Sequence, residues 1–145
     1  MTDRPIFYSL LKVAQRRVER WIEAEAEKLD GLSYAQGGLV LFLGRADGAA
    51  IGDAAEALDV APSAMTGLVD RMTRAGFVER RPDPRDGRGQ RLHLTEQGWA
   101  ARNQAVGMLE GLNDRMSEGL SADEARIIAR WLESLAGKFS REDQT

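Results

Sequence analysis

Apolar residues recur every three or four positions along most of the chain, which is the spacing of one face of an α-helix. The longest such stripe predicts a helix over residues 5–28, with polar and charged residues on its other face. The apolar members of this stripe are Ile6, Phe7, Leu10, Leu11, Ala14, Val18, Trp21 and Ile22. A second helix is predicted from Ser33, whose hydroxyl suits an N-cap, to about Arg45.

Two shorter helices are predicted next, over residues 51–58 and 62–75. Asp59 lies where the chain must turn sharply between them, and aspartate tolerates a left-handed backbone better than most residues. Pro62 suits the first position of the second of these helices, because the N–H that proline lacks has no partner there. Gly76 then follows as a C-terminal glycine. The pattern therefore predicts a helix-turn-helix.

The spacing then changes from helical to β-like. Two short runs, Phe77–Arg81 and Gln90–Leu94, flank a loop rich in Gly, Pro and Arg, which predicts a β-hairpin with a long basic tip. Thr95 is predicted to cap a helix that reaches about Gly119, and Ser121 begins a capping box that opens a last helix. The predicted order is α-α-α-α-β-β-α-α.

This order predicts a mainly α protein with a small β-hairpin wing, which is a winged helix-turn-helix with additional helices at both ends. The 145 residues suit one compact domain overall. We expect an N-terminal dimerisation helix in residues 1–32, a winged helix-turn-helix in 33–98 and C-terminal dimerisation helices in 99–145. Packing of the terminal helices within one subunit is the alternative to dimerisation.

The fourth predicted helix has two unlike faces on a helical wheel. One face is apolar and is predicted to pack inward; it contains Met65, Leu68, Val69 and Met72. The other face carries Ser63, Thr66, Gly67, Asp70 and Arg74, with Arg71 at its edge. Small side chains at the start of this face would let the helix approach base edges in the major groove, and a helix N-terminus favours phosphate. The alternative is an ordinary surface helix.

Charge is distributed unevenly along the chain. The net charge is −3, but the window from Pro62 to His93 holds seven arginines against four acidic residues, a net +3, so that the remaining chain carries −6. Attraction to phosphate is local, because salt screens charges over a distance of about 8–10 Å. A basic patch on an acidic protein is therefore compatible with DNA binding, although a solvated charged surface would show the same composition.

The hairpin tip carries Arg85 and Arg88 on a loop that has no evident way to pack against a core. An arginine that enters a narrow minor groove gains from the enhanced negative potential there. Asp86 is unsuited to direct phosphate contact, so we expect it to pair with an arginine and to hold the shape of the tip. The alternative is a disordered basic loop without a function.

Other classes of protein have little support in the sequence. The chain has no cysteine, which excludes a disulfide scaffold and a thiolate metal site. His93 is the single histidine, so no metal site is predicted, and its alternation with Leu92 and Leu94 directs it to solvent or to DNA. Neither a nucleophile arrangement nor a phosphate-binding glycine loop is present, so we predict no enzyme and no cofactor. A signal-peptide pattern and a membrane span are also absent, which predicts a cytoplasmic protein.

At this point the sequence resembles the multiple antibiotic resistance regulator (MarR) family of bacterial transcription factors. The resemblance runs through Ala54–Leu58, Ser63–Met72, Gly76–Arg80, Asp86–Arg88 and Leu94–Thr95, with Gly98 following. It covers the winged half closely, whereas the flanking helices match in length and order. Two departures are Gly52, where a hydroxyl cap is frequent, and Asp59, which replaces the usual turn glycine.

The resemblance implies a dimer in which the first and last helices interlock. It also implies that Ser63, Thr66 and Arg71 dock the recognition helix and that Arg88 reaches from the wing into the minor groove. Many members of the family are released from DNA by small phenolic or aromatic ligands, for which Tyr8, Tyr34 and Trp99 are the candidate lining residues.

The predicted function is therefore sequence-specific binding of double-stranded DNA by a homodimeric transcriptional repressor that recognises a palindromic operator and responds to a small aromatic ligand. The predicted DNA-binding residues are Ser63, Thr66, Gly67, Arg71, Arg74, Arg85, Asp86 and Arg88. The alternative is a winged-helix module that binds another protein and no specific DNA.

Overall fold

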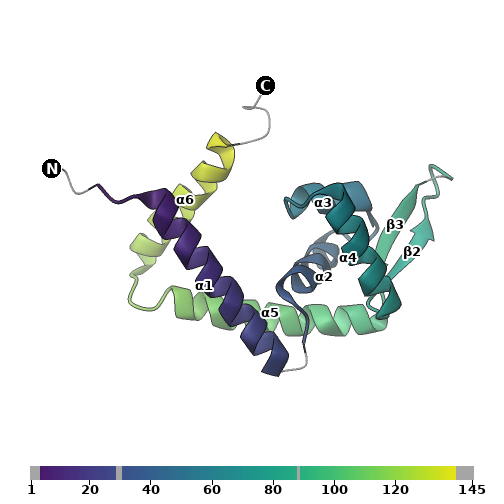
Figure 1. Ribbon diagram of the computed structural model, residues 1–145, viewed down its shortest axis with the longest axis horizontal. Coiled ribbons are helices and arrows are strands. Elements are labelled where there is room, and N and C mark those ends of the chain that lie inside the picture. The colour runs from purple at the N-terminus through teal and green to yellow at the C-terminus, as the bar shows by residue number, and fades with distance from the viewer. Residues whose placement is uncertain (1–3, 29–30, 88, 140–145) are drawn as a thin grey trace. The chain divides into compact units, whose positions relative to one another are not determined.

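A computed structural model of the protein describes residues 4–28, 31–87 and 89–139. Its elements follow the order α1 (Phe7–Lys28), α2 (Tyr34–Arg45), β1 (Ala49–Ala50), α3 (Ile51–Ala57), α4 (Pro62–Arg74), β2 (Val78–Pro82), β3 (Gln90–Leu94), α5 (Glu96–Met116) and α6 (Ala122–Lys138) (Figure 1). The predicted succession of helices and wing strands is confirmed. Arg88, the wing residue that the resemblance implicated in DNA binding, lies outside the described residues.

The chain divides into two compact units, Met1–Gly107 and Met108–Thr145. The first unit holds α1 to α4, all three strands and the first part of α5, and the second holds the end of α5 and α6. No helix in the part of the chain that the structure describes is both long and apolar enough to cross a membrane.

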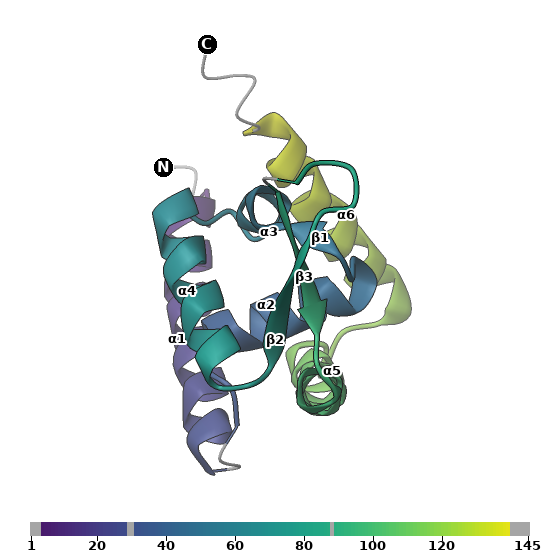
Figure 2. The same cartoon turned by 90° about the vertical axis from the view of Figure 1, so that its right-hand side faces the viewer.

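A short strand that the pattern did not predict joins the wing. β1 pairs with β3 in antiparallel fashion, and β3 also pairs with β2, so the sheet order is β1-β3-β2 (Figure 2). β1 consists of two alanines, which are too few to show a period-2 pattern. Strand β2 begins at Val78 and not at Phe77 as predicted, because the N–H of Phe77 still bonds to the last turn of α4 at Met72 (3.0 Å).

The core lies between the helix-turn-helix and the sheet. Its fully buried side chains come from α2, α4 and the two wing strands: Leu39, Val40, Leu43, Met65, Val69, Met72, Val78 and Leu92. The four apolar residues of α4 that were predicted to pack inward are all buried, which confirms that prediction. Burial of each such side chain stabilises the fold by about 1.5–3 kcal/mol.

Turn residues take the conformations that their types favour. Asp59 has φ 51° and is the non-glycine residue with positive φ among the described residues, as predicted for the turn between α3 and α4. Gly76 has φ 85° after the end of α4, which also agrees with prediction. The helix α3 has Ala50 as its N-cap, without a side-chain hydrogen bond. Gly52 thus lies inside α3 and does not take the cap position suggested by the family pattern.

Capping residues begin three further helices. The Ser33 hydroxyl accepts a hydrogen bond from the Gln36 N–H (3.3 Å), and the Gln36 side chain accepts one from the Ser33 N–H (3.1 Å), which completes a capping box. Thr95 Oγ1 accepts from the Gly98 N–H (3.0 Å), as expected for the cap of α5. Ser121 Oγ likewise accepts from the Glu124 N–H (3.1 Å) at the start of α6.

Two glycines in helices have opposite surroundings. A Cβ at Gly98 would collide with the carbonyl oxygen of Phe77, whereas a Cβ at Gly37 would meet nothing within 4 Å. We therefore expect Gly98→Ala to destabilise the protein by about 1–3 kcal/mol through overpacking. Gly37→Ala, the matched control, should stabilise it by about 0.5–1 kcal/mol because alanine loses less backbone entropy in a helix. Urea unfolding measures both changes, and equal midpoints for the two variants would contradict the described packing.

Candidate nucleic-acid interface

The exposed face of α4 carries the polar residues singled out in the sequence. Ser63, Thr66, Arg71 and Arg74 are exposed, while Gly67 and Asp70 are half-buried. The buried face of α4 fixes the rotation of the helix about its axis, so these side chains must lie on the side away from the core. The Thr66 hydroxyl donates a hydrogen bond to the Pro62 carbonyl (3.0 Å), which leaves its oxygen able to accept from a ligand.

Gly67 lies next to the side chain of Arg71. A Cβ at position 67 would lie 3.4 Å from an Nη atom of Arg71. Such a distance is ordinary van der Waals contact, so the guanidinium of Arg71 lies against the helix surface at Gly67 without requiring a glycine there. The two residues are four positions apart and so share this face of α4.

The N-terminus of α4 has free backbone donors. Its N-cap, Ala61, makes no side-chain hydrogen bond, and Pro62 occupies the first turn. The N–H groups of Ser63 and Ala64 thus have no capping side chain, in contrast to those that Ser33 and Ser121 cap in α2 and α6. The partial positive charge of a helix N-terminus favours an anion at this end of α4.

Ion pairs take up three of the seven arginines in the basic window. Arg80 on β2 pairs with Asp70 on α4, Arg81 pairs with Glu79 along β2, and Arg91 on β3 pairs with Asp83 (2.9 Å). The Arg80 pair links the wing to the helix beside it, since α4 and β2 pack against each other (Figure 2).

The remaining arginines carry the net positive charge of this region. Within the described residues, Arg71, Arg74 and Arg85 form no side-chain ion pair and are exposed. Two of them lie on α4 and one on the loop between β2 and β3, so the unpaired cations lie on the two elements that were predicted to contact DNA.

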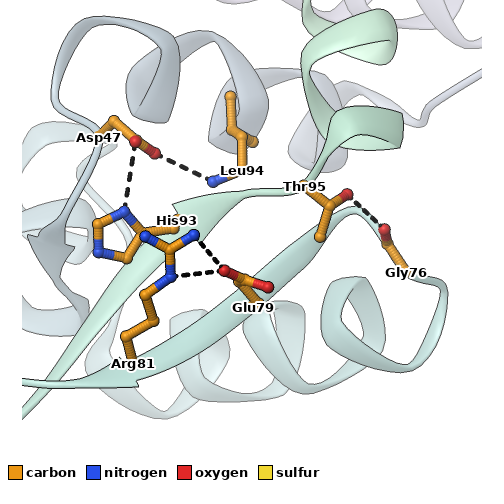
Figure 3. A network of polar contacts seen from close by, with 7 residues as sticks. All are labelled: Asp47, Gly76, Glu79, Arg81, His93, Leu94 and Thr95. Atoms are coloured by element: carbon orange, nitrogen blue, oxygen red, sulfur yellow. Dashed lines mark hydrogen bonds and ion pairs between the residues drawn. The ribbon is translucent and has the colours of Figure 1, made fainter.

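Asp47 anchors the base of the wing to the turn after α2 (Figure 3). One carboxylate oxygen of Asp47 accepts from the Leu94 N–H (3.0 Å), and the other lies 3.3 Å from Nδ1 of His93. His93 is therefore on the face opposite the buried Leu92 and Leu94, as predicted. The His93 side chain is only 20% exposed, and it lies against Asp47. It therefore does not project freely into solvent, which was one of its two predicted directions.

Thr95, directly after Leu94, joins the same end of the wing to the turn that follows α4. Its hydroxyl donates to the Gly76 carbonyl (2.6 Å), and its N–H donates to the Phe77 carbonyl (3.1 Å) (Figure 3). The Leu-Thr pair of the sequence motif thus has a structural explanation. The leucine fills the core, while the threonine caps α5 and ties it to the turn that follows α4.

Asp83 holds the wing loop and was not singled out from the sequence. Its carboxylate accepts from the Arg85 N–H (2.9 Å) and from Arg91 Nε (3.0 Å). Its own N–H donates to the Gly89 carbonyl (2.9 Å), and the Gly89 N–H donates to the carbonyl of Asp86 (3.0 Å). The signal in the sequence was the Asp-Pro dipeptide, because an aspartate side chain readily bonds the N–H two residues later.

The three aromatic residues proposed as ligand-lining are exposed. Tyr8, Tyr34 and Trp99 have exposed fractions of 74%, 50% and 38%. An open depression of about 490 Å³ lies elsewhere, between the end of α1 and the start of α2, and its lining is Glu23, Ala26, Glu27, Gly31, Ser33 and Gln36. A ligand site at the aromatic residues stays a prediction.

Comparison with known proteins agrees with this geometry. The model of the MarR family matches residues 30–89. The multiple antibiotic resistance protein MarR of Escherichia coli (strain K12) is 35% identical over 72 residues, which cover 49% of this chain and 50% of that protein. The matched segment thus spans about half the length of this relative.

Solved structures extend the similarity to almost the whole chain. A mutant of E. coli MarR complexed with operator DNA has a TM-score of 0.79 and 26% identity, over 88% of this chain and 91% of that one. The transcriptional regulator SlyA has a TM-score of 0.88 at 20% identity, over 95% and 96% of the two chains. FabT of Streptococcus pneumoniae, in complex with DNA, has a TM-score of 0.80 at 19% identity, over 96% and 97%.

The winged part of the chain is thus similar to the MarR family, and solved structures share its fold over almost the whole chain. SlyA and a MarR-family protein of Silicibacter pomeroyi are described as transcriptional regulators. The family model ends within the wing loop, and the structure shows that β3 and the Thr95 contacts complete the MarR-type wing beyond it.

The stability of the wing loop should depend on pH through Asp83. The hydrogen bond from the Arg85 N–H, reinforced by the Arg91 guanidinium and opposed by burial, lowers the pKa of the Asp83 carboxyl below its ordinary value of 3.8. The folded state therefore favours the ionised form more strongly than the unfolded chain does. This stabilisation is fully present above pH 3.8 and is lost as the pH falls below 3.8 through the lowered pKa.

Urea unfolding of the wild type and of Asp83→Asn, measured from neutral to acidic pH, tests this expectation. The difference in the free energy of unfolding between the two proteins should be constant near neutrality and should shrink once the pH falls below 3.8. A difference that stays constant down to strongly acidic pH would show that the folded state does not perturb this carboxyl.

Proposed function

We propose that this chain belongs to the MarR family and is a sequence-specific, double-stranded-DNA-binding transcriptional regulator that acts as a homodimeric repressor in the cytoplasm. The observation that carries the proposal is the exposed face of α4. It presents Ser63, Thr66 and Gly67 near an uncapped helix N-terminus, with the unpaired Arg71 and Arg74 farther along the helix. This arrangement suits a helix that enters the major groove with small residues first and contacts phosphates through its arginines.

The wing supplies a second contact in this proposal. Arg85 is exposed on the loop between β2 and β3, and Asp86 is exposed beside it. Arg88 follows two residues later in the sequence and is the expected minor-groove residue by resemblance to the family. A contact from the recognition helix together with one from the wing explains why the net positive charge is confined to these two elements.

Dimerisation would place two recognition helices on one face of DNA. Half-sites one helical turn apart lie about 34–36 Å from each other, and two copies related by a twofold axis can match them. Each compact unit carries exposed apolar side chains on a terminal helix. In α1 these include Phe7 (54% exposed) and Leu10 (59%), and in α6 they include Ile128 (41%) and Leu132 (43%). Apolar side chains exposed in such a series favour an interface.

A small aromatic ligand is the proposed release signal, with Tyr8, Tyr34 and Trp99 as the expected contacts. Aromatic side chains half-exposed in a monomer are available to stack on a planar ligand. The alternative function is a winged-helix module for another protein. In that case the α4 face would bind a protein partner, and no duplex would be preferred over another.

Selection from a random duplex library by the purified protein tests the proposed function. We expect enrichment of an inverted repeat with half-sites about 10 bp apart. On the selected duplex, Arg85→Ala should weaken binding and reduce the salt slope of log K by about 1, because one phosphate contact is lost. Thr66→Ala should change base preference, since its hydroxyl lies on the face directed at base edges.

Arg126→Ala is the matched control for Arg85→Ala. Arg126 is also an exposed arginine, but it belongs to the second compact unit and pairs with Asp123. It should leave the salt slope unchanged. Folded dimeric protein that enriches no sequence and is insensitive to Arg85→Ala would support the protein-binding alternative.

The dimer is tested separately by placing a lysine on each face of α6. Ile128→Lys puts a charge within the exposed apolar series and should dissociate the dimer at micromolar concentration, because a desolvated unpaired charge opposes association. Glu133→Lys puts the same residue on the opposite, polar face of α6 and should leave the dimer intact. Sedimentation velocity measures both, and a wild-type protein that sediments as a monomer would contradict dimerisation.

A further inference from the structure

The loop between β2 and β3 is closed by one carboxylate. Only 11% of the Asp83 side chain is exposed, against 34% for its partner Arg91. This is unusual for an acidic residue in the loop of a hairpin, where charged side chains normally face water. The carboxylate is enclosed because the loop folds around it. Gly89 permits this closure, since a Cβ at that position would lie 3.3 Å from the Cβ of Asp83.

The contacts of Asp83 divide into two kinds. The carboxylate binds the side chain of Arg91, whose Nε and Nη2 atoms lie 3.0 and 2.9 Å from Oδ2 of Asp83. From Arg85 the carboxylate accepts a hydrogen bond of the backbone N–H (2.9 Å). Pro84 stands between Asp83 and Arg85 and restricts its own φ to about −65°. The Arg85 backbone is thus held from both sides while its guanidinium stays exposed and without an ion pair in the described wing.

We propose that Asp83 is a positioning residue for DNA binding: it uses the Arg91 pair to seat its carboxylate and the Arg85 N–H to fix the point from which the Arg85 side chain reaches the phosphates. This inference rests on the proposed function. It assigns Arg91 to the interior of the loop and Arg85 to the DNA, although the sequence presents them as two similar arginines of one basic patch.

Simple electrostatics makes the opposite prediction, which allows a sharp test. A negative charge on a surface that faces DNA repels phosphate, so its removal alone should strengthen binding to any duplex and steepen the salt dependence. If Asp83 positions Arg85, removal of the Asp83 carboxylate should weaken binding. The backbone at Arg85 would then be less ordered in the free protein, and ordering it on binding would cost free energy.

The experiment compares the affinities of four proteins for the selected duplex: wild type, Asp83→Ala, Arg85→Ala and the double variant. We expect Asp83→Ala to weaken binding about tenfold in the wild-type background and less than about twofold in the Arg85→Ala background, since coupled residues are not additive. Hydrogen exchange of the Arg85 amide in the free protein should accelerate in Asp83→Ala. Asp83→Asn keeps a neutral acceptor for this amide. Its affinity and its exchange rate should therefore both lie between those of the wild type and of Asp83→Ala.

Glu79→Ala is the matched control, because Glu79 is another acidic residue of the same hairpin, paired with Arg81 on β2 and outside the loop. It removes the same charge and should leave binding unchanged or tighter. Equal effects of Asp83→Ala and Glu79→Ala, or an Asp83→Ala effect of the same size in both backgrounds, would overturn the positioning role while leaving DNA binding established. A wild-type protein that binds no duplex would overturn the proposed function and this inference together.

Discussion

The one-sided burial of α4 is the constraint on which the rest of this structure depends. Met65, Val69 and Met72 are fully buried between α2, α3 and the sheet. Burial of each contributes about 1.5–3 kcal/mol, whereas an exposed ion pair contributes about 0–1 kcal/mol. Core packing therefore sets the rotation of α4 about its axis, and the surface charges follow it. Ser63 and Thr66 are exposed because the other face of α4 is the one that packs into the core.

The arginines of this region fall into two groups, one that forms ion pairs within the protein and one that does not. Three arginines are paired with acidic residues, and these pairs join β2 to α4, two residues within β2, and the two ends of the wing loop. The positive charge that remains is concentrated on the exposed face of α4 and at the wing tip. Such a distribution neutralises the paired arginines and leaves the attraction of this region for an anionic partner on two adjoining elements.

Short polar side chains complete hydrogen bonding where regular elements end. Asp47 accepts the Leu94 N–H at a position that the two-residue strand β1 does not reach, and Thr95 satisfies the Gly76 carbonyl after α4. Asp83 does the same for the backbone of the wing loop. Each of these residues bonds a backbone group that no strand or helix partner satisfies. Leaving such a group unpaired would cost more free energy than losing a surface ion pair. The wing is consequently joined to the turns after α2 and α4 at the C-terminal end of β3.

The sequence by itself determined the helices, the hairpin strand Gln90–Leu94 and the inward face of α4, because periodicity and local turn preferences act within a few residues. It also determined the turn conformations of Asp59 and Gly76, which depend on the residue type alone. Only the tertiary structure decided that β1 exists, since two alanines carry no periodic signal. It alone separated paired from unpaired arginines, because the Arg80–Asp70 contact spans ten residues and requires the wing to fold back on α4. A charge shows its type in the sequence, but its partner depends on which elements the core brings together.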